Sequence, residues 1–232
     1  DVQYVVPLGV GSHLEYWGVE RHRIHELDWW DSVNSADLKI TATPARHASG
    51  RTLSPDSNQT LWAGFAFNGP ANNVYYSGDT GFFPEFEEIG DRLGPFDLTL
   101  LEAGQYDPSW PDWHLGPEHF VQAHQLLRGD RLMPIHWGLF ELALHTWTEP
   151  VERVKAAATC FGIPVLAPPP GMSIEPAALV ETAVWWPALK WEPAASTPIL
   201  ATAMGDAAVK VSPLAACPSQ TAGAAQVGEG LR

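Results

Sequence analysis

Apolar runs separated by turn-forming residues divide the first half of the chain into short predicted strands. The run at residues 2–6 is followed directly by Pro7 and the run at 38–42 is followed by Pro44 two residues later, which favours a buried strand followed by a break in each case. Residues 61–67 and 73–76 are predicted to form the two arms of a hairpin, because the intervening residues 68–70 (NGP) are turn formers. This half of the chain is therefore expected to be rich in strands.

The second half alternates between segments with helical spacing and short apolar runs. In residues 116–127 the apolar side chains recur at helical intervals, and a proline lies at the favoured first turn. The pattern predicts helices at residues 85–93, 116–127 and 149–161, and strands at 98–102, 131–135 and 164–167. Together the two halves indicate an α/β (α+β) fold in which helices pack against sheets.

Composition suggests three segments along the 232 residues. Residues 1–175 carry the predicted elements and are expected to form one domain. Residues 176–200 are richer in Ala, Pro and Thr, which suggests a peripheral extension. Residues 201–232 have little periodicity and no apolar face, so we expect a disordered tail. The 11 Trp residues are expected mainly in the core.

Charge and cysteine content exclude several classes of partner. The formal net charge is −14, which argues against nucleic-acid binding and disfavours docking on an anionic membrane. It does not exclude a lipid that enters an apolar groove. Two cysteines, Cys160 and Cys217, make no disulfide scaffold and no CxxC pair. No apolar run is long enough to span a bilayer. We expect a cytoplasmic protein, with peripheral association at a membrane as a second option.

Three metal-capable side chains follow predicted strands. His47 comes after the strand at 38–42, Asp79 after the strand at 73–76, and His136 directly after the strand at 131–135. Imidazole and carboxylate groups are ligands suited to zinc and similar ions. Any single histidine is more often an ordinary surface or core residue, and the spacing alone is a weak signal. The shared position at strand ends makes these three the preferred candidates for metal ligands.

Three further residues are weaker candidates. His114 precedes a predicted helix, where it either reaches a bound oxyanion or caps that helix. Glu102 ends a strand and either orients a metal-binding imidazole or pairs with a turn. His145 follows His136 by nine residues and is a less favoured candidate for the same pocket.

Several motifs resemble the metallo-β-lactamase superfamily, in particular its N-acylphosphatidylethanolamine phospholipase D-like branch. The motifs are TPARH at residues 43–47, YSGDTG at 76–81 and PIHWG at 134–138, supported by YVVPLG at 4–9, ELDWWD at 26–31 and LEAG at 101–104. They occur in the same order as in that family, and the resemblance covers residues 2–171.

The resemblance implies an αββα sandwich with two zinc ions at the edge of its sheets. By motif position, His47 would ligate one zinc, Asp79 would bridge both, and His136 would ligate the other. His114 would match a histidine near the substrate phosphate. In that family a metal-bound hydroxide attacks the phosphorus of a phosphodiester while the lipid occupies an apolar groove. Asp79 and His114 are accordingly the expected catalytic residues, and a small-molecule or lipid phosphodiester is the expected substrate.

One family motif is missing. The pattern His-x-His-x-Asp-His, which carries four further ligands, occurs nowhere in the sequence. The remaining residues supply about two contacts per ion, whereas a zinc site usually has about four ligands. We therefore expect an incomplete sandwich, a C-terminal fragment of such a hydrolase that is impaired on its own.

Two alternatives remain open. The same metal chemistry would serve a lactone or another ester, because a fold does not select its substrate. A non-catalytic reading assigns ligand or partner binding to the Trp-rich loop at residues 106–113. Metal content separates the enzyme from the binding module, since only the enzyme requires zinc. The sequence makes no prediction of the oligomeric state.

Overall fold

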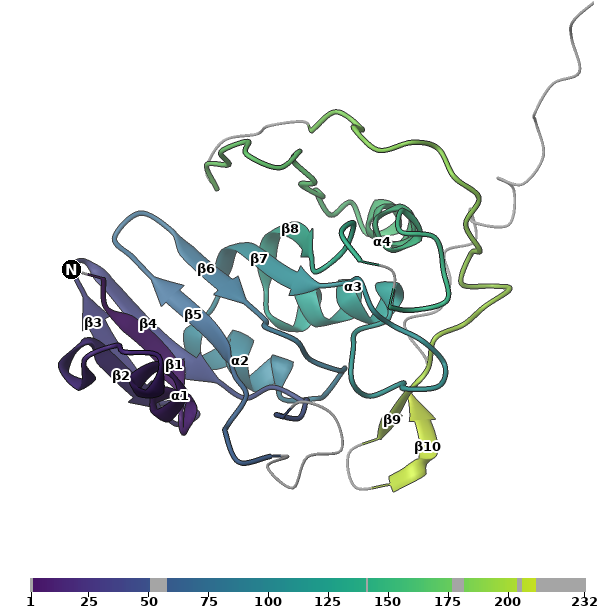
Figure 1. The fold of residues 1–232 in the computed structure, drawn as a ribbon. Helices are drawn as coiled ribbons and strands as arrows, with labels where there is room; N and C mark the ends of the chain where they lie inside the picture. The colour runs from purple at the N-terminus through teal and green to yellow at the C-terminus, as the bar shows by residue number, and fades with distance from the viewer. Residues whose placement is uncertain (1, 51–57, 141, 177–181, 204–205, 212–232) are drawn as a thin grey trace, which may run out of the picture.

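The structure is a computed structural model that describes residues 2–50, 58–140, 142–176, 182–203 and 206–211. Its centre is a six-stranded sheet in the order β3-β4-β5-β6-β7-β8 (Figure 1). The strands are β3 (Ser32–Ser35), β4 (Leu38–Thr43), β5 (Gly64–Asn68), β6 (Asn73–Tyr76), β7 (Phe96–Glu102) and β8 (Gly129–Ile135).

The direction of these strands determines where a site can form. Strands β3 to β6 pair antiparallel, whereas β6, β7 and β8 pair parallel. Because β4 and β6 are both antiparallel to β5, they run in the same direction as β7 and β8. The carboxyl ends of these four strands therefore lie along one edge of the sheet. In open sheets with parallel strands, this is the edge where ligands bind.

Helices cover one face of the sheet. Helices α2 (Phe86–Leu93) and α3 (Pro117–Leu126) lie behind the strands in Figure 1, and α4 (Glu149–Cys160) packs against α3. Proline at the first turn of α3 supplies a preset backbone angle where no amide donor is needed. Fully buried side chains fill the space between helices and sheet, among them Phe86, Phe120 and Leu132. None of the described helices combines the length and apolarity that a membrane span requires.

Two small sheets flank the central one. Strands β1 (Tyr4–Pro7) and β2 (Ile24–Leu27) pair in parallel, joined by α1 (Val10–Tyr16) and the short 3-10 helix η1 (Arg21–Arg23). They lie at the β3 end of the sheet in Figure 1. At the other end of the chain, β9 (Ala201–Ala203) and β10 (Asp206–Val211) form an antiparallel pair.

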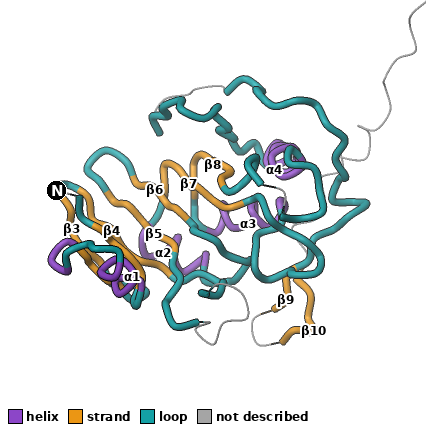
Figure 2. Tube along the Cα trace, viewed as in Figure 1, coloured by secondary structure: helices purple, strands orange, loops and turns teal. Residues whose placement is uncertain are grey.

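The segment before β9 is mostly irregular, as the loop colouring in Figure 2 shows, but part of it is anchored by tryptophans. Trp185 and Trp186 pack against Trp137 and Trp147, with ring centroids 5.3 to 6.3 Å apart. The Trp186 indole also donates a hydrogen bond to Glu152 of α4. These four tryptophans pack among themselves, but the expectation that the Trp residues lie mainly in the core is wrong. Trp186 alone is buried, whereas Trp17, Trp113 and Trp185 are exposed and the other seven are partly exposed.

The predicted mixture of helices and strands is confirmed, with three differences. Residues 164–167 form only a single parallel bridge, between Val165 and Leu132, instead of a strand. Residues 201–203 and 206–211 lie in strands, although we expected disorder from residue 201 onward; residues 212–232 lie outside the described part of the chain. The short strand β3 (Ser32–Ser35) was not predicted.

Candidate metal centre

Four of the sequence-predicted polar residues meet at the carboxyl edge of the central sheet. His47 comes four residues after β4, and Asp79 comes three residues after β6. Glu102 is the last residue of β7, and His136 directly follows β8. Glu102 pairs with Ile135 in the β7–β8 register, so the strand pairing itself brings Glu102 and His136 together.

Three imidazole rings form a row at this edge, with His114 in the middle. The ring centroids of His47 and His114 are 5.4 Å apart, and those of His114 and His136 are 5.3 Å apart. His114 comes from the loop between β7 and α3, where the backbone amide of Leu115 is anchored by the Glu102 carboxylate. The chain thus brings together three histidines separated by up to 89 positions, as their numbers show.

Asp79 lies at the His136 end of the row. The Asp79 Oδ1 atom is 3.6 Å from His136 Nε2. The Asp79 side chain is 46% exposed and that of His136 34%. This end of the centre is therefore open to solvent, and a substrate can approach it.

Glu102 lies beneath the row and is fully buried. Its Oε2 atom is 3.2 Å from His114 Nδ1 and 3.3 Å from His136 Nδ1. Its Oε1 atom accepts the amide hydrogen of Leu115. One carboxylate therefore contacts two histidine rings and the backbone of the loop that carries one of them.

The electrostatics of this contact favour an ionised Glu102. Burial alone would raise the pKa of Glu102, but hydrogen bonds from His114, His136 and the Leu115 amide outweigh it, and the pKa is lowered. The hydrogen bond to Glu102 raises the pKa of His136, against the opposing effect of burial. Because an ionised carboxylate only accepts, the Nδ1 atom of each ring is the donor and the Nε2 atoms face away from Glu102.

His47 presents an unpaired nitrogen. Its Nδ1 atom donates to the Ala48 carbonyl over 2.8 Å, so in the neutral ring Nε2 carries the lone pair. That Nε2 atom is buried and has no hydrogen-bond partner among the described residues. Buried polar atoms are rarely left unpaired, and a metal ion is one partner that would satisfy an imidazole lone pair.

Backbone contacts hold the loops that carry His47 and Asp79 together. The Arg46 amide donates to the Thr80 hydroxyl over 2.9 Å, and the Gly81 amide donates to the Arg46 carbonyl over 2.8 Å. Thr80 is completely buried. The residues next to His47 and Asp79 are therefore fixed to one another.

The backbone at His136 is tightly constrained. His136 has a φ of 64°, in the left-handed region that residues with a side chain seldom adopt. Gly104 lies against it, and a Cβ atom on Gly104 would be 1.6 Å from the His136 carbonyl oxygen. Strained backbone of this kind persists only where its surroundings enforce it, which is common at functional sites.

The remaining candidates take other positions. The His145 ring stacks on Tyr106 with centroids 4.3 Å apart, and it lines a hollow with Glu149 and Glu192. In the Trp-rich loop, Trp110 donates to the Gln105 carbonyl, while Trp113 is 54% exposed and lies 5.8 Å from the His47 ring. The loop therefore contributes one exposed indole to the rim of the centre.

Sequence reasoning did not find that Glu102 contacts both His114 and His136. The strand-end position of Glu102 was a signal that it could orient one imidazole, but no spacing rule connects it to two rings. The ligand-capable atoms of Glu102, His114 and His136 also lie within 4.8 Å of one another, which makes this trio a second arrangement able to hold a metal.

Comparison with known proteins gives a family match. A family model described as a beta-lactamase superfamily domain matches residues 1–137. That range includes all of His47, Asp79, Glu102, His114 and His136.

Among the proteins similar to the chain are two curated relatives and one solved structure. An uncharacterized protein of Mycobacterium tuberculosis is 48% identical over 186 residues, which covers 79% of this chain and 50% of that protein. The N-acyl-phosphatidylethanolamine-hydrolyzing phospholipase D 1 of Caenorhabditis elegans is 34% identical over 166 residues, which covers 67% of this chain and 46% of that protein. The chain thus spans about half the length of these relatives.

The solved structure is Igni18, a metallo hydrolase from the hyperthermophilic archaeon Ignicoccus hospitalis. It matches with a TM-score of 0.56 and 22% identity, covering 74% of this chain and 67% of Igni18. At this identity the likeness concerns the fold.

Proposed function

The chain belongs to the metallo-β-lactamase superfamily, which includes metal-dependent hydrolases, and we propose that it forms part of a zinc-dependent phosphodiester hydrolase. The observation that carries the proposal is the row of three histidines with Asp79 at one sheet edge, together with the unpaired buried Nε2 of His47. The relative named as a phospholipase D supports a phosphodiester as the substrate.

His47, Asp79 and His136 would hold the metal. Zinc bonds to imidazole nitrogen and carboxylate oxygen at about 2.0–2.2 Å, so two ligands of a tetrahedral ion lie about 3.4 Å apart. The 3.6 Å between His136 Nε2 and Asp79 Oδ1 fits one shared ion. The second oxygen of Asp79 would be available to a second ion, for which His47 would be a further ligand.

This arrangement is preferred over the trio of Glu102, His114 and His136. Glu102 is fully buried, and both of its oxygens already accept hydrogen bonds. A catalytic zinc keeps one position open for water or substrate. The exposed Asp79 side of the centre provides that access, whereas the Glu102 side does not.

When bound, the ions would lower the pKa of a water molecule and neutralise charge on the phosphoryl oxygens. Asp79 would fix the ions at the open side, where the substrate arrives. Because its Nδ1 donates to Glu102, His114 would donate from Nε2 to a phosphoryl oxygen in its protonated, imidazolium form. Asp79 and His114 are thus the proposed catalytic residues, and Glu102 is a positioning residue that orients the rings of His114 and His136.

The ligand set in these 232 residues is partial. His47, Asp79 and His136 supply fewer groups than two zinc ions require, and the sequence lacks His-x-His-x-Asp-His. We propose that those ligands belong to a part of the protein outside this sequence. The length of the relatives, about twice the matched segment, supports this.

The surroundings of His136 suit a lipid. Within eight residues of it lie four exposed apolar side chains, which are Leu139, Phe140, Leu142 and Leu144. They are between 70% and 93% exposed. Such a group could contact acyl chains at a membrane surface without a transmembrane segment, and the net charge of −14 favours a neutral surface over an anionic one. We propose a cytoplasmic protein that acts there.

The test is hydrolysis of bis-p-nitrophenyl phosphate by the full-length protein that contains this chain. We expect zinc-dependent turnover that falls at least about a hundredfold in Asp79→Ala, because the shared metal ligand is lost. Asp91→Ala is the matched control, since Asp91 is an exposed acid with only a 3.5 Å contact to Arg128. Near-normal turnover in Asp79→Ala would refute the proposal. Turnover of a p-nitrophenyl carboxylate ester without turnover of the diester would assign an ester hydrolase instead.

A further inference from the structure

The guanidinium of Arg46 binds three separate segments of the chain. Its Nη1 atom donates to the Phe82 carbonyl over 3.0 Å and to the Thr202 carbonyl over 2.8 Å. Its Nη2 atom donates to the Thr202 hydroxyl over 2.8 Å. Nη1 also lies 3.1 Å from Asp112 Oδ1. Arg46, the residue before His47, therefore contacts the loop after β6, the loop before α3 and strand β9.

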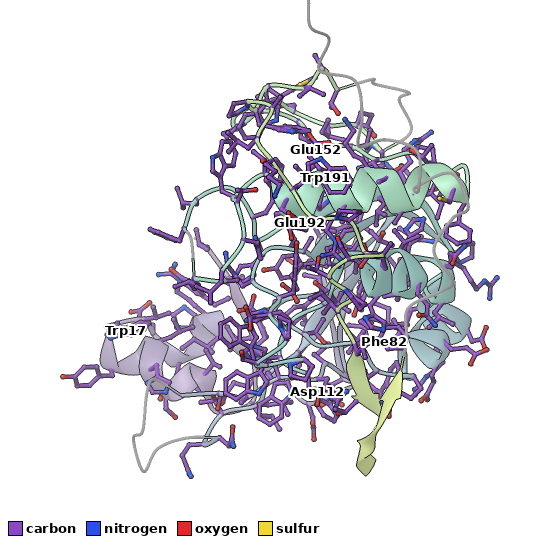
Figure 3. All side chains as sticks on the ribbon, turned by 90° about the vertical axis from the view of Figure 1, so that its right-hand side faces the viewer. Trp17, Phe82, Asp112, Glu152, Trp191 and Glu192 are labelled. Atoms are coloured by element: carbon purple, nitrogen blue, oxygen red, sulfur yellow. The ribbon has the colours of Figure 1, made fainter. Side chains whose placement is uncertain are left out.

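Thr202 completes the connection. Its backbone amide donates to Asp112 Oδ1 over 2.7 Å, and its hydroxyl donates to Asp112 Oδ2. Thr202 is 7% exposed. Figure 3 shows Asp112 and Phe82 beside the β9–β10 hairpin, in agreement with these bonds. We call Arg46, Asp112 and Thr202 the clasp.

The clasp joins the loops of two candidate site residues. Arg46 is adjacent to His47, and Asp112 lies two residues before His114. The loop of Asp112 is also in close contact with the backbone of the loop that carries Asp79, because a Cβ atom on Gly81 would be 1.9 Å from the Asp112 carbonyl oxygen. A shift of Asp112 would therefore move His114 relative to His47 and Asp79.

We infer that Thr202 of β9 is a positioning residue that holds the loop bearing His114 against the loop bearing His47. The consequence for catalysis rests on the proposed function, whereas the positioning itself does not. Thr202 lies beyond residue 137, where the family match ends. A segment outside the matched domain thus helps to set the geometry of the centre.

The chemistry of the clasp depends on the Thr202 hydroxyl. This hydroxyl accepts a hydrogen bond from Arg46 and donates one to Asp112. A valine has nearly the same shape but can form neither bond. The two remaining backbone bonds of Thr202 would persist in Thr202→Val. The variant therefore weakens the clasp without deleting β9. Serine keeps the hydroxyl, so Thr202→Ser should rescue the contact.

The test is hydrogen–deuterium exchange of the full-length protein, measured on peptides from residues 42–50, 107–116 and α4. In Thr202→Val we expect faster exchange in both loops, by at least about threefold, and unchanged exchange in α4. Thr202→Ser should restore the wild-type rates. Ser196→Ala is the matched control, because Ser196 is an exposed hydroxyl on the same segment that contacts only Glu192 and Pro193.

The same variants are then assayed on bis-p-nitrophenyl phosphate. Displacement of His114 should lower kcat by about tenfold in Thr202→Val, with recovery in Thr202→Ser. Wild-type exchange rates in both loops of Thr202→Val would overturn the clasp, and so would faster exchange spread equally over α4. Faster exchange confined to the two loops, in a protein that hydrolyses no phosphodiester, would uphold the clasp and refute the proposed function.

Discussion

Glu102 makes more contacts within the candidate centre than any other single side chain described above, and it offers a direct test at the residue scale. Glu102→Gln removes the negative charge that receives hydrogen bonds from His114 and His136. Since residues that orient metal-binding histidines typically contribute 10- to 100-fold to metal affinity, we expect a loss of roughly that size. Competition with a chromophoric chelator measures it in the full-length protein.

The matched control for this change is Glu88→Gln. Glu88 is an exposed glutamate on α2 that pairs only with Arg92, so its loss should leave metal affinity unchanged. Thermal melting of each variant shows whether it is folded. A folded Glu102→Gln variant that binds zinc as tightly as the wild type would contradict the positioning role of Glu102.

His124 provides a pH-dependent prediction outside the centre. It is 1% exposed, hydrogen-bonds the Thr99 hydroxyl over 2.7 Å, and burial lowers its pKa to about 4. The unfolded chain protonates this residue near pH 6.5 while the folded chain does not, so protonation favours unfolding. The contribution of neutral His124 to the free energy of unfolding is fully present above about pH 6.5 and declines as the pH falls toward 4. The expected loss is about 2 kcal/mol between pH 7 and pH 5.

Urea unfolding at both pH values measures this loss. His124→Asn, which keeps a side-chain group able to bond Thr99, is expected to be less stable at pH 7 but to lose about 2 kcal/mol less on acidification. An identical pH dependence in both proteins would show that His124 does not titrate in the predicted way.

The sequence predicts which residues follow strands, but it does not predict which side chains contact one another. His47, Asp79 and His136 could be selected because each follows an apolar strand, and the structure places them at one edge; their metal-binding role stays a prediction. The bonds between Thr202 and Arg46 join residues 156 positions apart. No local pattern encodes such a contact, because it depends on how β9 docks on the folded domain.

At the scale of secondary-structure elements, the ends of β7 and β8 carry the closest packing in the site. Gly104→Ala would place a methyl group 1.6 Å from the His136 carbonyl oxygen, and backbone on both sides leaves little room to adjust. We expect a loss of at least about 2 kcal/mol in the free energy of unfolding and weaker metal binding, because His136 must move. Denaturant unfolding and chelator competition measure the two effects.

Gly18→Ala is the control for this prediction. A Cβ atom on Gly18 would meet nothing within 4 Å, and only its φ of 93° opposes a side chain. Gly18→Ala is expected to lower the free energy of unfolding by about 1 kcal/mol and to leave metal binding unchanged. Equal losses in the two variants would show that the contact between Gly104 and His136 is not special.

Elements with a strong pattern were predicted well. The hairpin of β5 and β6 and the helices α2, α3 and α4 lie within a few residues of their predicted ranges. Strand β3 was missed because Ser32–Ser35 contains a single apolar residue and lies at the sheet edge. Residues 164–167 looked like a strand because they are apolar, yet only Val165 pairs, with Leu132.

At the scale of the whole molecule, the family resemblance and the mixed α and β architecture are confirmed. The order of strands could not be derived from periodicity, because it depends on which segments pair across long loops. The expected tail differs most, since residues 201–203 form a strand whose Thr202 bonds Arg46, the residue before His47. The proposed two-zinc site and the separation of residues 1–175 from residues 176–200 stay predictions.

The central claim is that His47, Asp79 and His136 share bound metal, and anomalous diffraction from zinc in crystals of the full-length protein tests it most directly. We predict anomalous peaks about 2.0–2.2 Å from His47 Nε2, from His136 Nε2 and from an Asp79 oxygen. A peak bound by Glu102 and the Nδ1 atoms of His114 and His136, with none near Asp79, would contradict the account.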